Sequence, residues 1–142
     1  MKSRHLQFDH ASVSVNDLTA AVQFYGRTLG LEQIKRPDFA FPGAWFRAGH
    51  TSIHLTTGGS VDRINKPLPG EPHLALALPT EHDLDELVEE LRTDGFPVYE
   101  LEHSPAALRQ VFVLDPSGNE IELCVNFQGS LDDNLANTGA GS

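Results

Sequence analysis

Hydrophobic and polar positions repeat along the chain in one order, and that order occurs twice. In the first copy, period-two alternation predicts a strand over residues 6–15. Asn16-Asp17 offers an N-cap, and apolar residues then recur at helical spacing as far as Gly30, where the helix is expected to end. Three further strands are predicted, near residues 31–36, 43–49 and 51–57.

The second copy follows the same order. A strand is predicted over 72–78 and a helix over about 82–94, in which Leu84, Leu87 and Leu91 form the apolar face. Strands are expected near residues 97–101, 109–115 and 119–125. The pattern therefore predicts two βαβββ modules and an α+β fold built on curved mixed sheets.

The pattern divides the chain into four segments. The first module takes residues 1–57, and the second takes residues 71–126. The segment 58–70 is rich in Gly and Pro and has no periodicity, so it is interpreted as a linker. Residues 127–142 lack core-forming side chains and are expected to be a disordered tail. At 142 residues the whole chain has the size of one domain.

Each module contributes two side chains that are common metal ligands. His10 and His73 stand in the opening strands, 73 − 10 = 63 residues apart. His54 and Glu122 each stand in the middle of an Ile-X-Leu strand, 122 − 54 = 68 residues apart. Because strand side chains alternate, all four are expected on the face away from the helices. Taken singly, each suits a solvated sheet face. Their equivalent places in a duplicated unit predict a shared metal site.

Composition narrows the function classes. The net charge is −10 and the pI is near 4.9, which argues against nucleic acid or an anionic membrane as a partner. The amino terminus has no apolar stretch typical of a signal peptide, and a single cysteine, Cys124, suits a reducing cytoplasm. Cys124 is expected in the core, and four further histidines are expected on the surface: His5, His50, His82 and His103.

The motifs around these residues resemble the vicinal oxygen chelate superfamily, which includes glyoxalase I, extradiol dioxygenases and bleomycin-binding proteins. The resemblance runs from about residue 6 to 126 and rests on DHASVSVNDLTAAVQFYGRTLGLE, IHL, PHLALAL and VFVLDPSGNEIEL. The segments KRPDFAFPGAW and AGHTSIHL are similar to a lactoylglutathione-lyase-like subgroup. The resemblance implies paired βαβββ modules in a cup-shaped sheet around one divalent metal ion (Zn, Ni, Co, Mn or Fe). Its ligand positions fall on His10, His54, His73 and Glu122.

The resemblance implies a lyase or isomerase of the glyoxalase class that stabilises an enediolate of a small oxygen-rich carbonyl compound. The resemblance implies that Glu122 and His54 occupy the catalytic positions of the family. Glyoxalase I usually has Glu or Gln at the position of His54. Ser14 and Gly58 replace the residues that bind glutathione in glyoxalase I, so glutathione dependence is not expected. Two alternatives remain: an extradiol-type Fe(II) dioxygenase using His10, His73 and Glu122, and a non-catalytic drug- or metabolite-binding protein of the bleomycin-resistance type.

Substrate contacts and assembly complete the predictions. Arg47 and Arg109 are candidate contacts for an anionic substrate, and Trp45 and Phe112 are candidate walls of an apolar pocket, as is Phe41. The family resemblance implies a homodimer that binds a small molecule.

Overall fold

The computed structural model describes residues 2–59 and 64–127. The predicted tail beyond residue 127 and residues 60–63 of the predicted linker lie outside this part of the chain. The chain divides into two compact units. The first comprises residues 1–65 and 114–119, and the second comprises residues 66–113 and 120–142.

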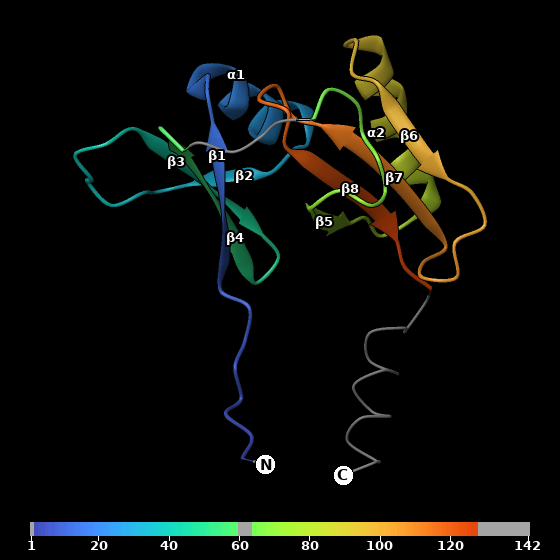
Figure 1. The fold of residues 1–142 in the computed structure, drawn as a ribbon, viewed down its shortest axis with the longest axis horizontal. Helices are drawn as coiled ribbons and strands as arrows, with labels where there is room; N and C mark the ends of the chain where they lie inside the picture. The colour runs from blue at the N-terminus through green and yellow to red at the C-terminus, as the bar shows by residue number, and fades with distance from the viewer. Residues whose placement is uncertain (1, 60–63, 128–142) are drawn as a thin grey trace. The chain divides into compact units, whose positions relative to one another are not determined.

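The first unit contains the four strands and the helix of the first predicted module. Its sheet has the order β1-β4-β3-β2, with β1 parallel to β4 and the other pairs antiparallel (Figure 1). The elements are β1 (His10–Val15), α1 (Leu18–Val22), η1 (Gln23–Thr28), β2 (Glu32–Ile34), β3 (Gly43–Ala48) and β4 (Thr51–Thr57).

Strand β1 is shorter than the sequence pattern predicts, since it begins at His10 rather than at residue 6. The reason is the register: His10 lies opposite Ser52, and β4 begins only at Thr51. The residues before Asp9 have no strand residue opposite them, and Leu6 and Phe8 are exposed. Strand β2 is likewise shortened, because Arg36 leaves the sheet and enters the loop before β3.

The predicted helix begins as expected but changes its winding. The Asp17 side chain caps α1 by accepting a hydrogen bond from the Ala20 amide. From Gln23 the chain forms a π-helix, in which the Leu29 amide donates to the Phe24 carbonyl. The wider turn lets two adjacent aromatic side chains, Phe24 and Tyr25, both enter the core. They pack with the inward face of the sheet, whose buried members are Val13, Val15, Ala44, Phe46, Ile53 and Leu55.

The second unit repeats the architecture with the order β5-β8-β7-β6 and with β5 parallel to β8. Its elements are β5 (His73–Ala77), α2 (Glu81–Thr93), β6 (Val98–Leu101), β7 (Arg109–Leu114) and β8 (Glu120–Val125). Leu84 and Leu91 of α2 are buried as predicted, whereas Val88 is buried in place of Leu87. Two four-stranded mixed sheets with few helices confirm the predicted α+β class and the βαβββ order.

The turn between β7 and β8, which contains the DPSGN segment, belongs to the first unit. Asp115 is buried and accepts a 2.7 Å hydrogen bond from the Tyr25 hydroxyl. The amides of Ser117 and Asn119 also donate to Asp115. The Asn119 side chain donates to the Ser14 carbonyl of β1. The turn is therefore fixed against both the helix and the first strand of this unit.

Among the described residues, no helix combines the length and the apolar character that a membrane span requires.

Candidate functional site

The two units place their ligand-type residues in the same geometric relation. In the first unit Ser12 lies opposite His54, and His10 stands two residues before Ser12. In the second unit Ala75 lies opposite Glu122, and His73 stands two residues before Ala75. Diagonal neighbours of this kind lie on one face of a sheet and within reach of long side chains. The duplication seen in the sequence therefore extends to the register of the strands.

In the second unit, His73 and Glu122 bring their ligand atoms together. His73 Nε2 lies 3.2 Å from Glu122 Oε1. His73 Nδ1 donates to the Glu71 carbonyl at 2.6 Å, which directs Nε2 toward the carboxylate of Glu122. The side-chain amide of Gln110 donates to the other oxygen of Glu122 at 3.3 Å. Phe112 packs edge-on against the His73 ring at a centroid distance of 5.3 Å. The pair is thus held in one orientation by its neighbours.

A second carboxylate, Glu120, lies buried beside this pair. Its Oε2 is 3.4 Å from His73 Nδ1, and its Oε1 accepts a hydrogen bond from the Leu68 amide. Burial raises the pKa of Glu120, and the Leu68 hydrogen bond opposes that shift. All residues of β8 are buried, so the face that carries Glu122 is less open than the sequence pattern predicts.

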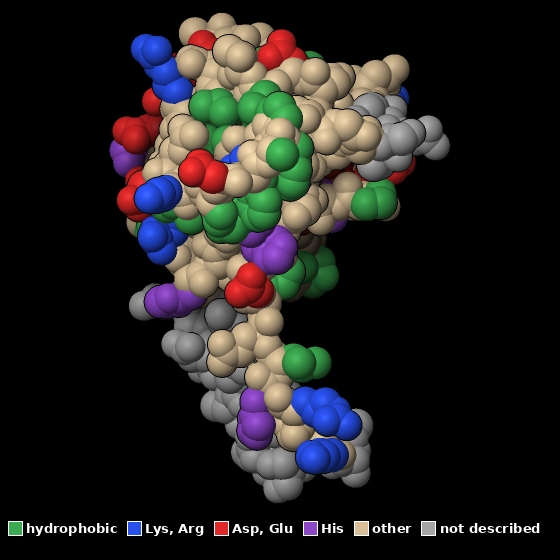
Figure 2. Space-filling model, turned by 90° about the vertical axis from the view of Figure 1, so that its left-hand side faces the viewer, with side chains coloured by type: hydrophobic (Ala, Val, Ile, Leu, Met, Phe, Trp, Pro, Cys, Tyr) green, Lys and Arg blue, Asp and Glu red, His purple; other side chains and the backbone are tan. Residues whose placement is uncertain are grey.

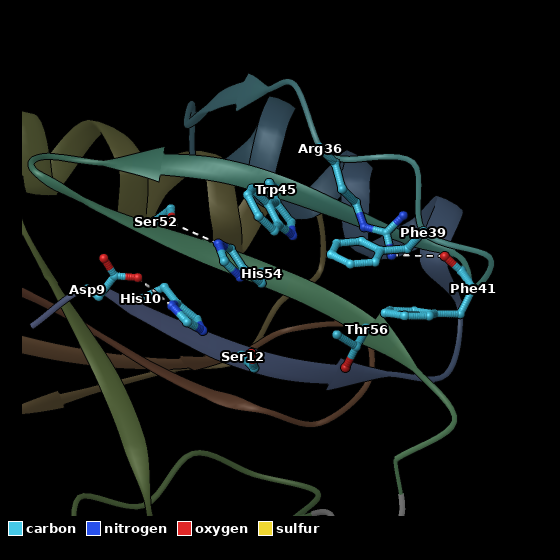
Figure 3. A pocket seen from close by; sticks show the side chains of 10 residues that line it. All are labelled: Asp9, His10, Ser12, Arg36, Phe39, Phe41, Trp45, Ser52, His54 and Thr56. Carbon is cyan, nitrogen blue, oxygen red and sulfur yellow. Dashed lines mark hydrogen bonds and ion pairs between the residues drawn. The ribbon is translucent and has the colours of Figure 1, made fainter.

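In the first unit, His54 lies between two other rings (Figure 3). The Trp45 indole stacks on it at a centroid distance of 3.8 Å, and the His10 imidazole stacks on it at 4.1 Å. His54 Nε2 is in hydrogen-bond contact with Ser52 Oγ at 2.8 Å. Burial, followed by the charge of His10, lowers the pKa of His54, so its imidazole is neutral near pH 7.

The donor chemistry of these pairs fits a divalent metal ion. His10 Nδ1 donates to the Asp9 carboxylate at 2.7 Å, just as His73 Nδ1 donates to a carbonyl. Metal-binding histidines almost always have one ring nitrogen held in this way, which directs the other lone pair at the ion. Among the described residues, no group of three or more His, Cys, Asp and Glu side chains is gathered closely enough to hold an ion. Each unit by itself brings two ligand-type side chains together, His10 with His54 in the first and His73 with Glu122 in the second.

A pocket of about 590 Å³ opens beside His54 in the first unit (Figure 3). Its floor consists of small polar side chains of β1 and β4, and its wall consists of aromatic side chains from β3 and the loop before it. On the side of the molecule that Figure 2 shows, hydrophobic side chains gather next to histidine and acidic side chains. The lining residues are Asp9, His10, Ser12, Arg36, Phe39, Phe41, Trp45, Ser52, His54 and Thr56.

The four predicted substrate contacts lie in different environments. Trp45 lines the pocket, as does Phe41. Arg47 is exposed and pairs with Glu32 at 3.3 Å, outside the pocket lining. Phe112 is fully buried. The substrate-binding roles of these residues remain predictions.

Arg109, the fourth of them, is held by two carboxylates of its own unit. It donates to Glu100 at 2.7 Å and to Asp85 at 2.5 Å. The hydrogen bond to Glu100, then that to Asp85, raises the pKa of Arg109. These bonds tie β7 to β6 and α2, so a substrate anion would have to displace a carboxylate to reach this guanidinium.

Sequence reasoning missed Arg36, Phe39 and Gln110. The first two precede β3 in the segment RPDFAF, whose two phenylalanines follow an arginine closely, but a loop has no periodicity that would show where they point. No feature of the sequence around Gln110 indicates that its side chain contacts a site residue. The surface position of the four other histidines and the burial of Cys124 are confirmed. Burial also raises the pKa of the Cys124 thiol, which disfavours the reactive thiolate.

The chain is similar to known proteins of one superfamily. The family model of the Glyoxalase/Bleomycin resistance protein/Dioxygenase superfamily matches residues 7–123. The protein named Glyoxylase I 4 from Arabidopsis thaliana is 27% identical over 120 residues, which cover 82% of this chain and 68% of that protein.

Solved structures show the same fold. A protein from Bacillus anthracis described as of the glyoxalase family has a TM-score of 0.74 and 27% identity, covering 89% of this chain and 100% of that one. A variant of the fosfomycin resistance protein FosX from Listeria monocytogenes, complexed with Mn(II) and 1S,2S-dihydroxypropylphosphonic acid, has a TM-score of 0.71 and 17% identity. That match covers 88% of this chain and 95% of the FosX chain.

Proposed function

Because the chain belongs to the Glyoxalase/Bleomycin resistance protein/Dioxygenase superfamily, we propose that it is a divalent-metal-dependent lyase or isomerase of the glyoxalase class. Its substrate is a small oxygen-rich carbonyl compound. The observation that carries the proposal is the pairing of His73 Nε2 with Glu122 Oε1 at 3.2 Å, with the other imidazole nitrogen already held by a carbonyl.

The proposed ligands are His10, His54, His73 and Glu122. Support for His10 and His73 comes from their Nδ1 partners, which leave each Nε2 for an ion. Glu122 supplies one negative charge that offsets part of the charge of a divalent ion. His54 is the fourth donor, and ligation through its Nε2 requires the loss of its contact with Ser52. Ligands of this mixed type accept Zn²⁺, Ni²⁺, Co²⁺, Mn²⁺ or Fe²⁺.

A bound divalent ion would polarise the substrate carbonyl and stabilise the negative charge that develops on its oxygen. The remaining work is a proton transfer between adjacent carbons. We assign Glu122 as the base that removes the proton from the hydroxyl-bearing carbon and returns it to the neighbouring carbonyl carbon, while the hydroxyl proton passes to the former carbonyl oxygen. No atom is gained or lost in this isomerisation. The Gln110 amide holds the carboxylate by donating to its second oxygen.

One observation favours a second function. His54 Nε2 is engaged by Ser52, and without His54 the proposed ligand set is His10, His73 and Glu122. Two histidines and one carboxylate are the ligand set of many Fe(II) oxygenases. An extradiol-type dioxygenase is therefore the alternative. Consumption of O₂ with a catechol and Fe²⁺, without turnover of carbonyl compounds, would select it.

Turnover of methylglyoxal, with and without glutathione, tests the leading proposal directly. The protein is assayed after addition of each candidate divalent metal in turn. We expect activity with at least one metal and a loss of about 100-fold or more in Glu122→Gln, which keeps the shape of the side chain but cannot accept the proton. Glu102→Gln, at an exposed glutamate of the second unit, is the matched control and should leave the rate unchanged.

Equal rates in wild type and Glu122→Gln would remove Glu122 as the base. An absence of turnover with every metal, both with and without glutathione, would remove methylglyoxal as a substrate.

A further inference from the structure

Arg36 occupies an unusual position in the aromatic pocket of the first unit. Its guanidinium lies 4.9 Å from the ring centroids of both Phe39 and Phe41. Its Nη2 donates a 2.9 Å hydrogen bond to the Phe41 carbonyl. In Figure 3 the guanidinium lies close to both phenylalanine rings, and all three residues come from the loop that leads into β3. Cation–π contacts and a backbone hydrogen bond together fix the charge at one place in the pocket wall.

Gly43 is the residue that makes this position accessible. A Cβ at Gly43 would lie 2.8 Å from Nε of Arg36 and 2.7 Å from the Leu55 carbonyl oxygen. Both distances are shorter than van der Waals contact allows. The guanidinium therefore packs directly on the backbone of β3, in space that any other side chain at position 43 would take. The arginine is held before a ligand arrives, which reduces the ordering cost of binding.

The charge of Arg36 is available to a ligand. Among the described residues, no carboxylate forms an ion pair with it, whereas Arg47 and Arg109 are each paired with acidic side chains. Of the ten residues that line the pocket, Arg36 is the single Lys or Arg. One of the five N–H groups of the guanidinium is used by the Phe41 carbonyl, and a planar fork of this kind matches a carboxylate well.

The rest of the pocket favours a planar apolar group. Phe39 and Trp45 have their ring centroids 6.4 Å apart and form the wall beside Arg36. Phe39 and Phe41 remain about half exposed, at 46% and 51%, so their surfaces can be covered by a ligand. The volume of about 590 Å³ is typical of sites for small molecules. A cationic ligand is disfavoured because Arg36 already covers the faces of two rings with positive charge.

The acidic residue of the pocket limits the ligand further. Asp9 lies at the His10 end and is mostly exposed, with its carboxylate on the His10 ring. Its negative charge disfavours a second anionic group at that end. A pocket with one cation, an aromatic wall and an acidic rim is matched by a small molecule with one carboxylate rather than by one with two.

We propose that this pocket selects a small monocarboxylate that carries an aryl or similarly planar apolar group. Arg36 binds the carboxylate, and Phe39 and Trp45 contact the planar group. The inference rests on the proposed function in one respect only, since it takes the occupant of this pocket to be the substrate of the adjoining metal site. Binding itself is independent of metal.

The test uses the fluorescence of Trp45, which is the only tryptophan of the chain and lines the pocket. Metal-free full-length protein in chelator is titrated with phenylacetate, with its neutral isostere phenylacetamide, and with acetate. We expect a saturable change with phenylacetate, an affinity for phenylacetamide that is about tenfold lower or weaker still, and no saturable change with acetate. Equal affinity for the acid and the amide in wild-type protein would overturn the proposal, and so would the absence of saturable binding of phenylacetate.

Arg36→Gln assigns the selectivity to one residue. The variant should bind phenylacetate about tenfold more weakly and phenylacetamide as well as before. Arg27→Gln is the matched control, because it removes an exposed arginine of the first unit that lies outside the pocket lining. Loss of phenylacetate binding in Arg27→Gln but not in Arg36→Gln would contradict the assignment. The metal-dependent turnover assay is a separate measurement, so phenylacetate binding in a protein without methylglyoxal turnover would remove methylglyoxal as a substrate and leave the assignment of the pocket intact.

Discussion

At the scale of single residues, Asp115 has the most constrained environment in the first unit. Its carboxylate is 3% exposed, and hydrogen bonds from Tyr25, Ser117 and Asn119 replace the water it loses. Burial of a carboxylate is costly unless such donors satisfy it. The DPSGN segment is therefore explained by the stability of the turn, and its chemistry does not need a role in catalysis.

We predict that Tyr25→Phe destabilises the protein by about 1.5–3 kcal/mol, because the variant removes one of the two hydrogen bonds that the buried Oδ2 of Asp115 accepts. Denaturant unfolding followed by circular dichroism measures the change. Tyr99→Phe removes a hydroxyl from a 42% exposed tyrosine and should cost much less. Similar losses in the two variants would contradict the importance of the Tyr25–Asp115 bond.

The sequence predicted which residues face the core better than it predicted side-chain contacts. Alternation placed Val13, Val15, Ile53 and Leu55 inward and His10 and His54 on the other face, and the burial of these residues of the first unit agrees. The stack of His54 between Trp45 and His10 was not foreseen, because it depends on the register of three strands. The place of Arg36 was not foreseen either, because it depends on a loop that turns back over Gly43.

At the scale of secondary-structure elements, helix α2 is stabilised at its start by a reciprocal cap. The Thr80 side chain accepts a hydrogen bond from the Asp83 amide and donates one to the Asp83 carboxylate. Two acidic residues, Glu81 and Asp83, lie in the first turn, where the helix dipole favours negative charge. The helix in turn buries Leu84, Val88 and Leu91 against the second unit's core.

We predict that Thr80→Ala lowers the free energy of unfolding by about 1 kcal/mol, which is typical of a lost N-cap. Thermal and urea unfolding measure the effect. Thr93→Ala, at an exposed position in the last turn of the same helix, is the control and should be close to neutral. A loss in Thr93→Ala equal to that in Thr80→Ala would show that the cap contributes nothing specific.

The errors in the predicted elements have physical causes that lie outside the local sequence. The order and type of the elements follow from periodicity and were predicted. The early start of the first strand was wrong because alternation continues into residues that have no partner strand. The π-helical winding of residues 23–28 was missed. The spacing of apolar residues does not show whether backbone hydrogen bonds join residues five apart, as in a π-helix, or four apart, as in an α-helix.

At the scale of the whole molecule, duplication is the organising feature. Each unit carries a parallel strand pair with ligand-type residues at diagonal positions, in an identical register. Within each unit the two ligand-type side chains lie together. From the spacing, the sequence predicted one metal site shared by all four side chains, and that shared site stays a prediction. The metal, the substrate and a homodimer remain predictions, since they depend on a bound ion, a ligand or a second chain.

The most direct test of the central claim is the metal content of the protein as purified and after titration with each candidate divalent ion. We predict one tightly bound ion per chain in the wild type. We predict its loss in His10→Ala, which alters the first unit, and equally in Glu122→Ala, which alters the second. His82→Ala, at an exposed histidine of α2, is the control and should retain the ion. Retention of the full metal content in either His10→Ala or Glu122→Ala, with the fold intact, would contradict the claim that the two pairs serve one ion.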